Sequence, residues 1–496
     1  MPSRLQQLDK RFVWHPFTQM RDWLKGDPIV IGSGHGATLR DIRGREYLDA
    51  NSSIWTNLHG HNHPKINAAI RRQLKKIAHS SALGLANEPA SLLAAKMVSA
   101  ANPESAIRNP KLSKVFYSDD GSTALEVALK LAYEYTRRTR SKSARGAAQP
   151  APARFLSLDG AYHGDTIGAV SLGHIDLFHK AYRGLLFKTD KVPSPYCYRC
   201  PFNRARPERD DARNHRKCEW ECVGKFEQQF STQKKKRDPY AAFVFEPLMQ
   251  GAAGMIPQPE GWLKRVTAIA RGHGALLIAD EVMTGFGRTG VGVQASACQE
   301  NAPKRGLQQH PPLFACQQEA VEPDFLCLAK GMTGGYLPMA ATLTTRKVFD
   351  AFLGEYHEFK TFFHGHSYTA NQLGAAASLA SLEILQSERS IQARRRLEMT
   401  LAEELKTLWS LPQVGDIRRT GLVAGIELVR DWRTKEPFAL RDRIGIRVCE
   451  AMAKRGVLTR SIGNVIVLMP PYCTTPGQTK RMIDVLRDSV ATTLKR

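Results

Sequence analysis

A lysine at the end of a short apolar segment is the first residue of this sequence whose position could support covalent chemistry. The apolar segment runs from Phe325 to Ala329, and Lys330 follows it directly, before a turn with glycines at 331, 334 and 335. The amine of a lysine at the end of a buried strand can be partly desolvated and unprotonated, so that it can attack a carbonyl group and form a Schiff base. Most lysines at strand ends are solvated surface groups, so this position alone leaves both interpretations open.

A carboxylate follows a second apolar segment in the same way. Residues 275–279 are apolar, and Asp280 and Glu281 come directly after them. A carboxylate at a strand end can keep the pyridinium nitrogen of pyridoxal phosphate protonated, which makes the cofactor ring an electron sink. A lysine and an aspartate at the ends of separate strands are the minimum set for this cofactor, so Lys330 and Asp280 together favour a pyridoxal-phosphate enzyme.

A glycine and a serine follow a third predicted strand, at residues 114–117. Gly121 and Ser122 stand before an amphipathic segment that predicts a helix to about residue 138. The free N–H groups and the dipole of a helix N-terminus favour phosphate binding. Plain helix capping is the alternative, because Thr123 and Glu126 have the spacing of a capping box. Together with Lys330, the phosphate interpretation is preferred.

Two more predicted strands, at residues 155–158 and 241–245, lead to Tyr162 and Glu246. An aromatic ring at a strand end can stack on a flat cofactor or cover a core, and the carboxylate could equally belong to a salt bridge. In an open parallel α/β sheet, ligands bind at the carboxyl ends of the strands. The pattern across five strands therefore predicts an α/β fold with a mainly parallel sheet and a ligand site at this edge.

The segments around Asp280 and Lys330 resemble the signature of the class III aminotransferases, a group of the aspartate-aminotransferase superfamily. The matching residues are Asp-Glu-Val-Met-Thr-Gly-Phe-Gly-Arg-Thr-Gly at 280–290 and Ala-Lys-Gly at 329–331. Residues 291–313 interrupt the usual spacing, and their polar, proline-bearing composition predicts a surface excursion. The resemblance covers nearly the whole chain, and it implies the fold type I of pyridoxal-phosphate-dependent transferases.

The resemblance also implies roles for single residues. Lys330 would hold the cofactor and move protons, Asp280 would contact the ring nitrogen, and Tyr162 would lie beside the ring and the substrate as a third catalytic residue. Glu246 would lie near the cofactor. Arg418 matches the arginine that grips the substrate carboxylate, a task that suits a guanidinium fork. The neighbouring arginine at 419 and a surface ion pair are the alternatives.

The other implied contacts come from loops. The residues expected to touch the cofactor phosphate are Gly121, Ser122, His366 and Ser367, and those expected to line the substrate pocket are Phe17, Ile54, Trp55 and Gly365. In the family the second phosphate-binding segment, at the start of an Ala-rich helix, belongs to the neighbouring subunit. The resemblance therefore implies an obligate homodimer with shared active sites. Relatives commonly have tryptophan at the position of Ile54, which leaves the pocket shape open.

Two segments resemble one subfamily in particular, Trp-His-Pro-Phe-Thr at 14–18 and Tyr-His-Gly-Asp-Thr at 162–166. This resemblance implies amination of 8-amino-7-oxononanoate to 7,8-diaminononanoate in biotin synthesis, with S-adenosylmethionine as the default amino donor and lysine as the alternative. Another class III transaminase acting on an ω-amino acid or a diamine is the second possibility. A basic nucleic-acid-binding protein that has kept the fold without catalysis is the third.

Length and composition set the organisation of the chain. Its 496 residues are too many for one small core. We expect an N-terminal segment (1–75) contributing to the small domain and the substrate pocket, a large cofactor-binding domain (76–345) and a C-terminal small domain (346–496), with strands near 422–427 and 465–468. The sequence has no apolar run that could span a membrane and no signal-peptide core at its start, so we expect a soluble, cytoplasmic protein without a membrane partner.

The charge of the chain has no pattern typical of nucleic-acid binding. The formal net charge is +24, but the basic residues are scattered and lack interleaved aromatic residues that could stack on bases. We therefore expect no nucleic-acid partner. A basic surface still favours encounters with an anionic cofactor and with carboxylate substrates.

Cysteines and histidines offer two possible metal sites. Cys197, Cys200, Cys218 and Cys222 form two pairs with seventeen residues between them, which is close to the spacing of structural zinc sites, with a histidine at 215 nearby. Free thiols are the alternative interpretation and the preferred one. Histidines at 59, 61 and 63 precede a proline that suits the first turn of a helix, so we expect them to lead into that helix. We expect no metal at either place.

Overall fold

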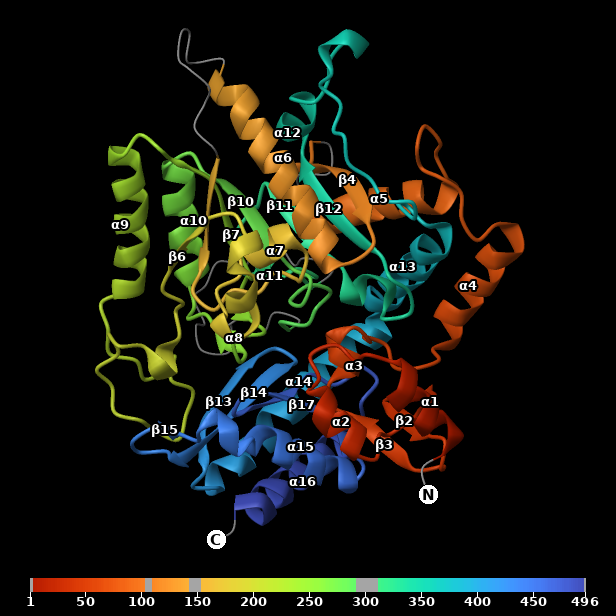
Figure 1. The fold of residues 1–496 in the computed structure, drawn as a ribbon, viewed down its shortest axis with the longest axis vertical. Coiled ribbons are helices and arrows are strands. Elements are labelled where there is room, and N and C mark those ends of the chain that lie inside the picture. Colours follow the sequence, from red (N-terminus) through yellow and green to blue (C-terminus); the bar gives the residue numbers. More distant parts are fainter. Residues whose placement is uncertain (1–2, 103–108, 142–152, 291–310, 495–496) are drawn as a thin grey trace.

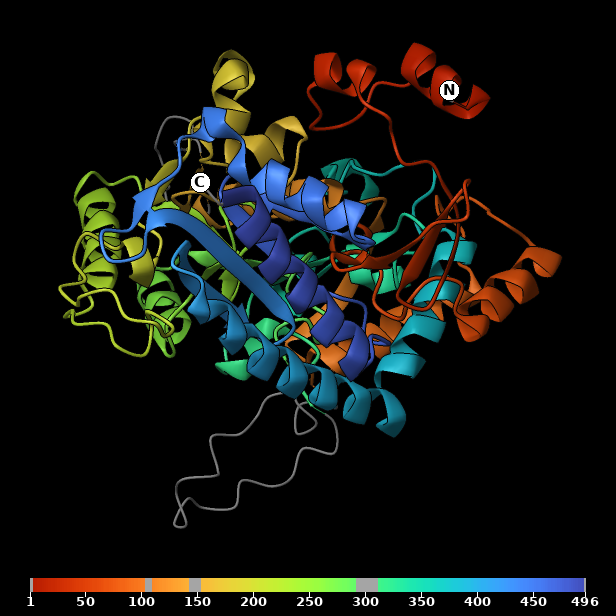
Figure 2. The same cartoon turned by 90° about the horizontal axis from the view of Figure 1, so that it is seen from below.

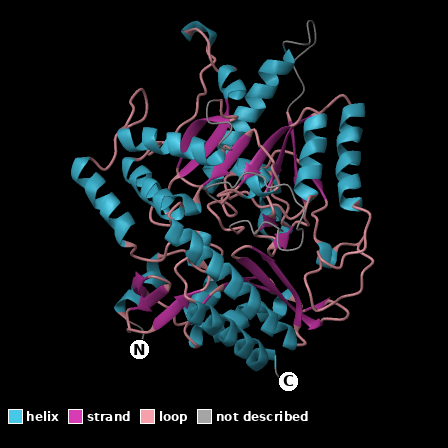
Figure 3. Ribbon diagram, turned by 180° about the vertical axis from the view of Figure 1, so that it is seen from behind, coloured by secondary structure: helices cyan, strands magenta, loops and turns pink. Residues whose placement is uncertain are grey.

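The structure is a computed structural model that describes residues 3–102, 109–141, 153–290 and 311–494. Figure 1 shows a large sheet between helices in the upper half of the molecule and smaller sheets below it, where the N-terminal and C-terminal regions meet. Figure 3, seen from behind, shows the same two groups of strands with helices around them. No helix within the described ranges is long and apolar enough to cross a membrane.

The large sheet has seven strands and confirms the predicted mainly parallel α/β fold. Its order is β4 (Leu112–Ser118), β12 (Ala340–Thr345), β11 (Phe325–Leu328), β10 (Leu276–Asp280), β7 (Tyr240–Phe245), β5 (Arg154–Leu158) and β6 (Asp190–Val192). Strand β12 pairs antiparallel with both β4 and β11, whereas β11, β10, β7, β5 and β6 pair in parallel. Strand β4 therefore runs in the same direction as β11, and the five strands named in the sequence end at one edge.

Helices cover both faces of this sheet because successive residues of its strands point to opposite sides. In β7, Phe243 and Phe245 belong to the core that includes α5 (Glu88–Ala101) and α10 (Trp262–Gly272), while Val244 belongs to the core beneath α6 (Gly121–Ser141). All six residues of β7 are buried. Central strands that are apolar on both faces are typical of doubly covered parallel sheets.

The remaining elements lie in both halves of the molecule. The helices are α1 (Arg4–Phe12), α2 (Met20–Lys25), α3 (Ser52–Trp55), α4 (Pro64–Lys76), α7 (Ile167–Ser171), α8 (Asp176–His179), α9 (Glu221–Lys235), α11 (Ala315–Gln318), α12 (Arg346–Asp350), α13 (Gln372–Leu385), α14 (Glu388–Lys406), α15 (Ile444–Lys454) and α16 (Pro476–Leu494). Single 3-10 turns are η2 (Lys180–Leu185), η3 (Cys197–Arg199), η4 (Lys330–Thr333), η5 (Tyr356–Glu358), η6 (Thr407–Ser410) and η7 (Leu440–Asp442).

Two smaller sheets lie beside the large one, and the first of them joins the two ends of the chain. One has the order β1 (Ile31–His35), β2 (Thr38–Asp41), β3 (Glu46–Asp49) and β16 (Val457–Leu458), so an N-terminal strand pairs with a C-terminal one. The other contains β13 (Val414–Thr420), β14 (Val423–Asp431), β18 (Val465–Leu468) and β17 (Arg460–Ile462), with β15 (Glu436–Pro437) beside β14. Strands β8 (Met249–Gln250) and β9 (Ile256–Pro257) form a hairpin. The domain boundaries at 75/76 and 345/346 stay a prediction.

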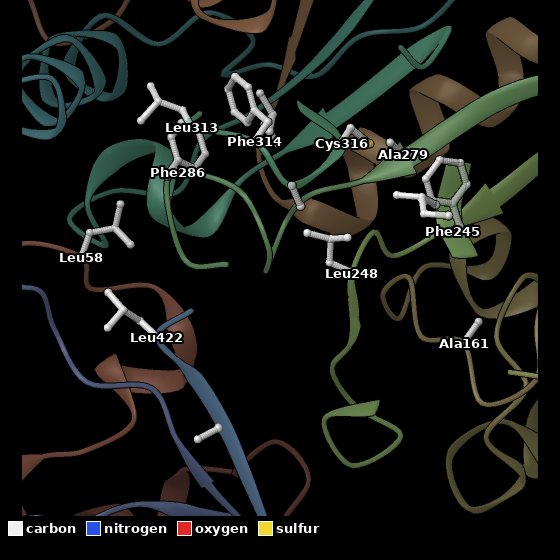
Figure 4. Packing of buried hydrophobic residues seen from close by; sticks show 14 of the residues in the cluster. Leu58, Ala161, Phe245, Leu248, Ala279, Phe286, Leu313, Phe314, Cys316 and Leu422 are labelled. Atoms are coloured by element: carbon white, nitrogen blue, oxygen red, sulfur yellow. The ribbon is translucent and has the colours of Figure 1, made fainter. Parts of the chain in front are cut away.

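The hydrophobic core continues from the large sheet into the C-terminal region. Leu58 of the N-terminal region and Leu422, between β13 and β14, belong to the same cluster of buried residues as Phe286 and Leu313. Figure 4 labels these side chains around one region between the two halves. Helices α14 and α16 lie side by side beneath it, as Figure 2 shows from below, while α1 and α2 stand at the edge of the molecule.

Three predictions concerned a hairpin turn and two helix starts. Two of them are confirmed and one is wrong. Gly44 turns the hairpin between β2 and β3 with φ 83°, and Pro64 begins α4 with His63 as its N-cap. The capping box expected from Thr123 and Glu126 is absent: α6 begins three residues earlier than that box would place it, at Gly121, and Asp120 Oδ1 accepts the N–H of Thr123 at 2.9 Å. Glu126 instead accepts from the N–H of residue 168, because α7 packs against α6 there.

Candidate functional site

A cavity of about 590 Å³ lies at the carboxyl edge of the large sheet, which is a size typical of small-molecule sites. Its wall contains nine of the residues singled out in the sequence, namely Phe17, Ile54, Trp55, Gly121, Ser122, Tyr162, Glu246, Asp280 and Lys330. The five strand ends therefore converge on one cavity.

Asp280 is held in place by hydrogen bonds to both of its carboxylate oxygens. Its Oδ2 lies 2.8 Å from Nδ1 of His163, and its Oδ1 accepts the N–H of Val282 at 3.0 Å. Both side chains of the His163–Asp280 pair are buried, and both residues line the cavity. The sequence argument did not assign a role to His163, although this histidine directly follows Tyr162.

Glu246 is buried beside this pair. Its Oε2 accepts the N–H of Gly251 at 2.7 Å, and its Oε1 accepts the N–H of Tyr162 at 3.3 Å. Burial raises the pKa of Glu246 to about 7, against a smaller opposing effect of His163. The carboxyl group therefore fixes two loops at the cavity floor while it titrates near neutral pH.

The amine of Lys330 enters the cavity from the end of β11. Its Nζ lies 4.6 Å from the ring centroid of Trp55, and within the described ranges it makes no ion pair. Burial lowers the pKa of Lys330 below its ordinary value, while the charges of Asp280 and Glu246 oppose that shift. A larger fraction of unprotonated amine makes this lysine a better nucleophile toward a carbonyl group.

The N-terminus of α6 supplies free hydrogen-bond donors to the cavity. The N–H groups of Gly121 and Ser122 donate to no acceptor among the described residues, and both residues line the cavity. A Cβ at position 121 would lie 2.7 Å from the side chain of Val282, so glycine allows the helix to approach the loop after Asp280. Free N–H groups at the start of a long helix are suited to a phosphate group.

Tyr162 forms part of the aromatic wall. Its hydroxyl donates to Asp165 at 2.6 Å, and burial together with this bond raises the pKa of the phenol. Its ring lies 6.3 Å from that of Phe178, which in turn meets Phe17 edge-on at 5.3 Å. These rings give the outer part of the cavity an apolar surface.

Arg460 brings a positive charge to this apolar part of the cavity. It lies on β17, is exposed, and donates from one guanidinium nitrogen to the carbonyl of Phe17 at 3.5 Å. Arg460 and Lys330 are the arginine and the lysine of the described cavity wall. The sequence argument missed it, because nothing in the short segment around residue 460 indicates its position relative to the large sheet.

Arg418 is not at the cavity, contrary to the sequence-based assignment. Its side chain is 1% exposed and pairs with Glu427 and, at 3.6 Å, with Asp416. It also donates to the hydroxyl of Tyr196. The alternative, Arg419, pairs with Glu398 at 3.5 Å. A guanidinium that is buried and committed to two carboxylates has no free edge for a substrate, so the structure does not support Arg418 as the carboxylate ligand.

Three predicted contact residues, Gly365, His366 and Ser367, do not line the cavity of their own chain. His366 lies 3.1 Å from Asp119, next to the α6 N-terminus, and Ser367 is exposed. They precede α13 instead of starting it, because Asn371 caps that helix. Their expected contact is with a neighbouring subunit, and it stays a prediction.

The candidate metal residues have other roles in the described structure. The cysteines at 197, 200, 218 and 222 are free thiols, and burial raises the pKa of Cys197 to about 12. His61 contacts Asp49, and His59 contacts Ser381. Over the ranges that the structure describes, no group of three or more His, Cys, Asp or Glu side chains could hold a metal ion. Most of the interrupting segment 291–313 lies outside the described residues.

The sequence matches the family model for class-III aminotransferases over residues 23–301 and 306–490. The chain therefore belongs to the class III aminotransferases, enzymes that use pyridoxal phosphate as their cofactor. The fold and the convergence of Lys330, Asp280 and the α6 N-terminus agree with this membership.

Several relatives are similar over nearly the whole chain. The adenosylmethionine-8-amino-7-oxononanoate aminotransferase of Nitratidesulfovibrio vulgaris is 46% identical over 98% of this chain and 82% of its own length. The enzyme of the same name from Geobacter sulfurreducens is 44% identical over 98% of this chain and 97% of its own.

Solved structures agree with these relatives. The crystal structure of the Methanocaldococcus jannaschii enzyme of that name superposes with a TM-score of 0.83, at 38% identity and 98% coverage of both chains. An amine transaminase from a Pseudomonas species in its PLP-bound form gives a TM-score of 0.82, at 30% identity over 97% of this chain and 98% of that one.

The residues present fit pyridoxal phosphate. The free N–H groups of Gly121 and Ser122 suit its phosphate, the carboxylate of Asp280 suits its ring nitrogen, and the free amine of Lys330 suits its aldehyde. The imidazole of His163 would hold Asp280 in position, since its Nδ1 is already bonded to that carboxylate.

Proposed function

We propose that this aminotransferase converts 8-amino-7-oxononanoate to 7,8-diaminononanoate, a step of biotin synthesis. The observation that carries the proposal is the cavity itself, with a reactive amine at Lys330, an apolar wall around Phe17 and a guanidinium at Arg460. A keto acid with a long aliphatic chain needs these three features. The names of the relatives support the same substrate.

In this proposal each catalytic residue of the chain has a separate role. Pyridoxal phosphate, when bound, supplies the electron sink that lets a proton leave the substrate carbon. Lys330 would hold the cofactor and would carry that proton on its amine. Asp280 would face the ring nitrogen and favour its protonated form, and Tyr162 would cover the site from the outer side.

The substrate carboxylate would bind Arg460 in place of Arg418. The support is that Arg460 lines the cavity with an exposed guanidinium, whereas Arg418 is buried in an ion-pair cluster. A guanidinium can bind both oxygens of a carboxylate at once. Ile54 and Trp55 would lie along the aliphatic part of the substrate.

The active enzyme would be a cytoplasmic homodimer. Its two sites would be shared, with Gly365, His366 and Ser367 of each chain completing the site of the other. The exposure of Ser367 and the position of His366 outside its own cavity are consistent with this arrangement. The expected partners are small-molecule substrates and a second copy of the chain.

The test is an assay of the purified protein with 8-amino-7-oxononanoate and, separately, pyruvate as amino acceptors. The proposal predicts 7,8-diaminononanoate as the product. Activity with pyruvate alone would replace it with a transaminase for an ω-amino acid or a diamine. A panel of donors identifies the amino donor, for which S-adenosylmethionine is the default and lysine the alternative.

A further inference from the structure

Four consecutive residues, two of which line the cavity, have a left-handed backbone. The φ angles of Ser52, Ser53, Ile54 and Trp55 are 47°, 47°, 62° and 68°. Residues with a Cβ are disfavoured in this region because the Cβ crowds the following carbonyl group, and β-branched residues are rare there. A run of four such residues persists where the surrounding structure holds it, and such sites are often functional.

This left-handed turn determines where two wall residues stand relative to the reactive amine. Ile54 and Trp55 both line the cavity, and the Trp55 ring lies 4.6 Å from Nζ of Lys330. A relaxed, right-handed backbone at 52–55 would move both side chains. The shape of the substrate wall next to Lys330 thus depends on a conformation that these residue types disfavour.

Asp49, at the end of β3, holds the turn through both oxygens of its carboxylate. Its Oδ1 accepts the N–H groups of Asn51 at 3.2 Å and Ser53 at 3.1 Å. Its Oδ2 accepts the hydroxyl of Ser53 at 3.1 Å and contacts Nε2 of His61 at 2.9 Å. Burial raises the pKa of Asp49, but the bonds from His61 and Ser53 outweigh it, so the pKa lies below the ordinary value.

Two neighbours support this arrangement. Nδ1 of His61 lies 3.0 Å from the amide nitrogen of Asn57, which leaves the proton on Nε2 to be donated to Asp49. The side-chain oxygen of Asn51 accepts the indole N–H of Trp55 at 2.8 Å. The carboxylate at 49 is therefore the centre of a network that ends on a residue of the cavity wall.

We propose that Asp49 is a positioning residue for substrate binding, which acts by holding residues 52–55 in the left-handed conformation. Asp49 itself does not belong to the described cavity wall. The proposal rests on the proposed function, because it assumes that the cavity beside Lys330 binds the substrates.

The test compares two identical substitutions in the same small sheet. In the Asp49→Asn variant one oxygen becomes an NH2 group, which accepts no hydrogen bond. The side chain then loses either the bonds from the N–H groups of Asn51 and Ser53 or those from the Ser53 hydroxyl and His61. We expect KM for the amino acceptor to rise about tenfold and kcat to change less than about threefold, as for the loss of one charge-assisted hydrogen bond in binding.

Asp41→Asn is the matched control. Asp41 ends β2 and accepts the N–H groups of Arg43 and Arg45, both at 2.9 Å, and the hydroxyl of Tyr47 at 3.0 Å. It has no bond to the turn. We expect this control to lower the melting temperature and leave KM unchanged. A KM that rises equally in both variants, or in neither, would overturn the proposal.

A rescue separates positioning from general stability. Glycine adopts positive φ without steric cost, so Ser53→Gly in the Asp49→Asn background should restore KM to within about threefold of the parent. Failure of this rescue in a folded double variant would overturn the proposal. If Asp49→Asn does not fold, Ser53→Ala, which removes the hydroxyl donor, should raise KM severalfold, and an unchanged KM would be the contrary result.

A crystal structure of the Asp49→Asn variant shows the backbone conformation of residues 52–55 without an activity assay. We expect the positive φ angles at 52–55 to be lost, and their retention would overturn the proposal. This result is independent of turnover, so an inactive parent protein would count against the proposed function and not against the role of Asp49.

Discussion

Nδ1 of His163 lies 2.8 Å from Oδ2 of Asp280, and both side chains are buried at the cavity floor. With the N–H of Val282 on the other oxygen, the carboxylate has a fixed orientation. A carboxylate that is held by the protein costs no reorganisation when it stabilises charge on a bound group. This pair explains how one aspartate at a strand end can hold a ring nitrogen protonated.

Replacement of this aspartate should abolish most of the activity. We expect Asp280→Asn to lower kcat by about a hundredfold or more, because the amide carries no charge to stabilise the protonated ring nitrogen. Steady-state kinetics measures the loss.

The control for this variant is Glu281→Gln at the next position. Glu281 is buried but accepts the N–H groups of Ala315 and Cys316, away from the cavity. This control should lower stability and keep most of the activity. Comparable losses of kcat in both variants would contradict the role given to Asp280.

Arg460 should control affinity for the carboxylate of the substrate. We expect Arg460→Ala to raise KM for the acceptor by about 10- to 100-fold, as for the loss of a hydrogen bond between charged groups, with a much smaller change in kcat. Saturation curves for the acceptor measure it. An unchanged KM would show that another residue binds the carboxylate.

Arg418 should matter for stability. Removal of its guanidinium leaves Glu427 and Asp416 buried with less compensation, although Arg199 also contacts Glu427. Breaking a buried ion pair costs about 3 to 5 kcal/mol, so Arg418→Ala should lower the free energy of unfolding by that order. Denaturant titration measures it. A stable variant with an increased KM would reinstate Arg418 as the substrate ligand.

Glu246 should make stability depend on pH. Its pKa is raised from 4.5 to about 7 in the folded protein, so the folded state binds its proton more tightly than the unfolded state. The resulting loss of folding stability is absent below pH 4.5, grows as the pH rises toward 7, and reaches about 3 kcal/mol at most. The cofactor-free Glu246→Gln variant should therefore gain stability over the parent as the pH increases through this window.

Thermal unfolding of both cofactor-free proteins between pH 5 and about 8 measures this difference. Burial also raises the pKa of Glu281 to about 7, so the stability of one protein alone would report both groups. The difference in stability between the two proteins at each pH isolates the contribution of Glu246. A difference that is constant with pH would show that the carboxyl group of Glu246 titrates as an ordinary glutamate.

The sequence predicted the floor of the cavity because one rule applies to it. Lys330, Asp280 and Glu246 each follow a buried strand, and strands of the same direction end at one edge of a sheet. The sequence alone shows each apolar segment and the polar residue at its end, whatever the order of the strands in the sheet. Their convergence on one cavity therefore did not depend on the tertiary details.

The rest of the site depends on register and on how the sheets are placed. Arg418 and Glu427 come together because β13 and β14 pair with Arg418 opposite Gly425, which puts the glutamate on the same face. Arg460 reaches the cavity because the small sheet packs beside the large one. Neither relationship has a periodic signal in the sequence, so the sequence alone could not show that Arg460 lines the cavity and that Arg418 does not.

The left-handed turn at 52–55 had no signal in the sequence either. Serine, isoleucine and tryptophan do not favour positive φ, and the turn exists because Asp49 and its neighbours hold it. Conformations that contradict local preference are expected at functional sites.

The most direct test of the account is reduction of the cofactor-loaded protein with borohydride, followed by peptide mapping. Covalent attachment of the cofactor to the amine of Lys330 predicts that the peptide containing this residue gains the mass of the reduced cofactor, and that Lys330→Ala gains none. A Lys330 peptide of unchanged mass, or a label on another lysine, would contradict the central claim.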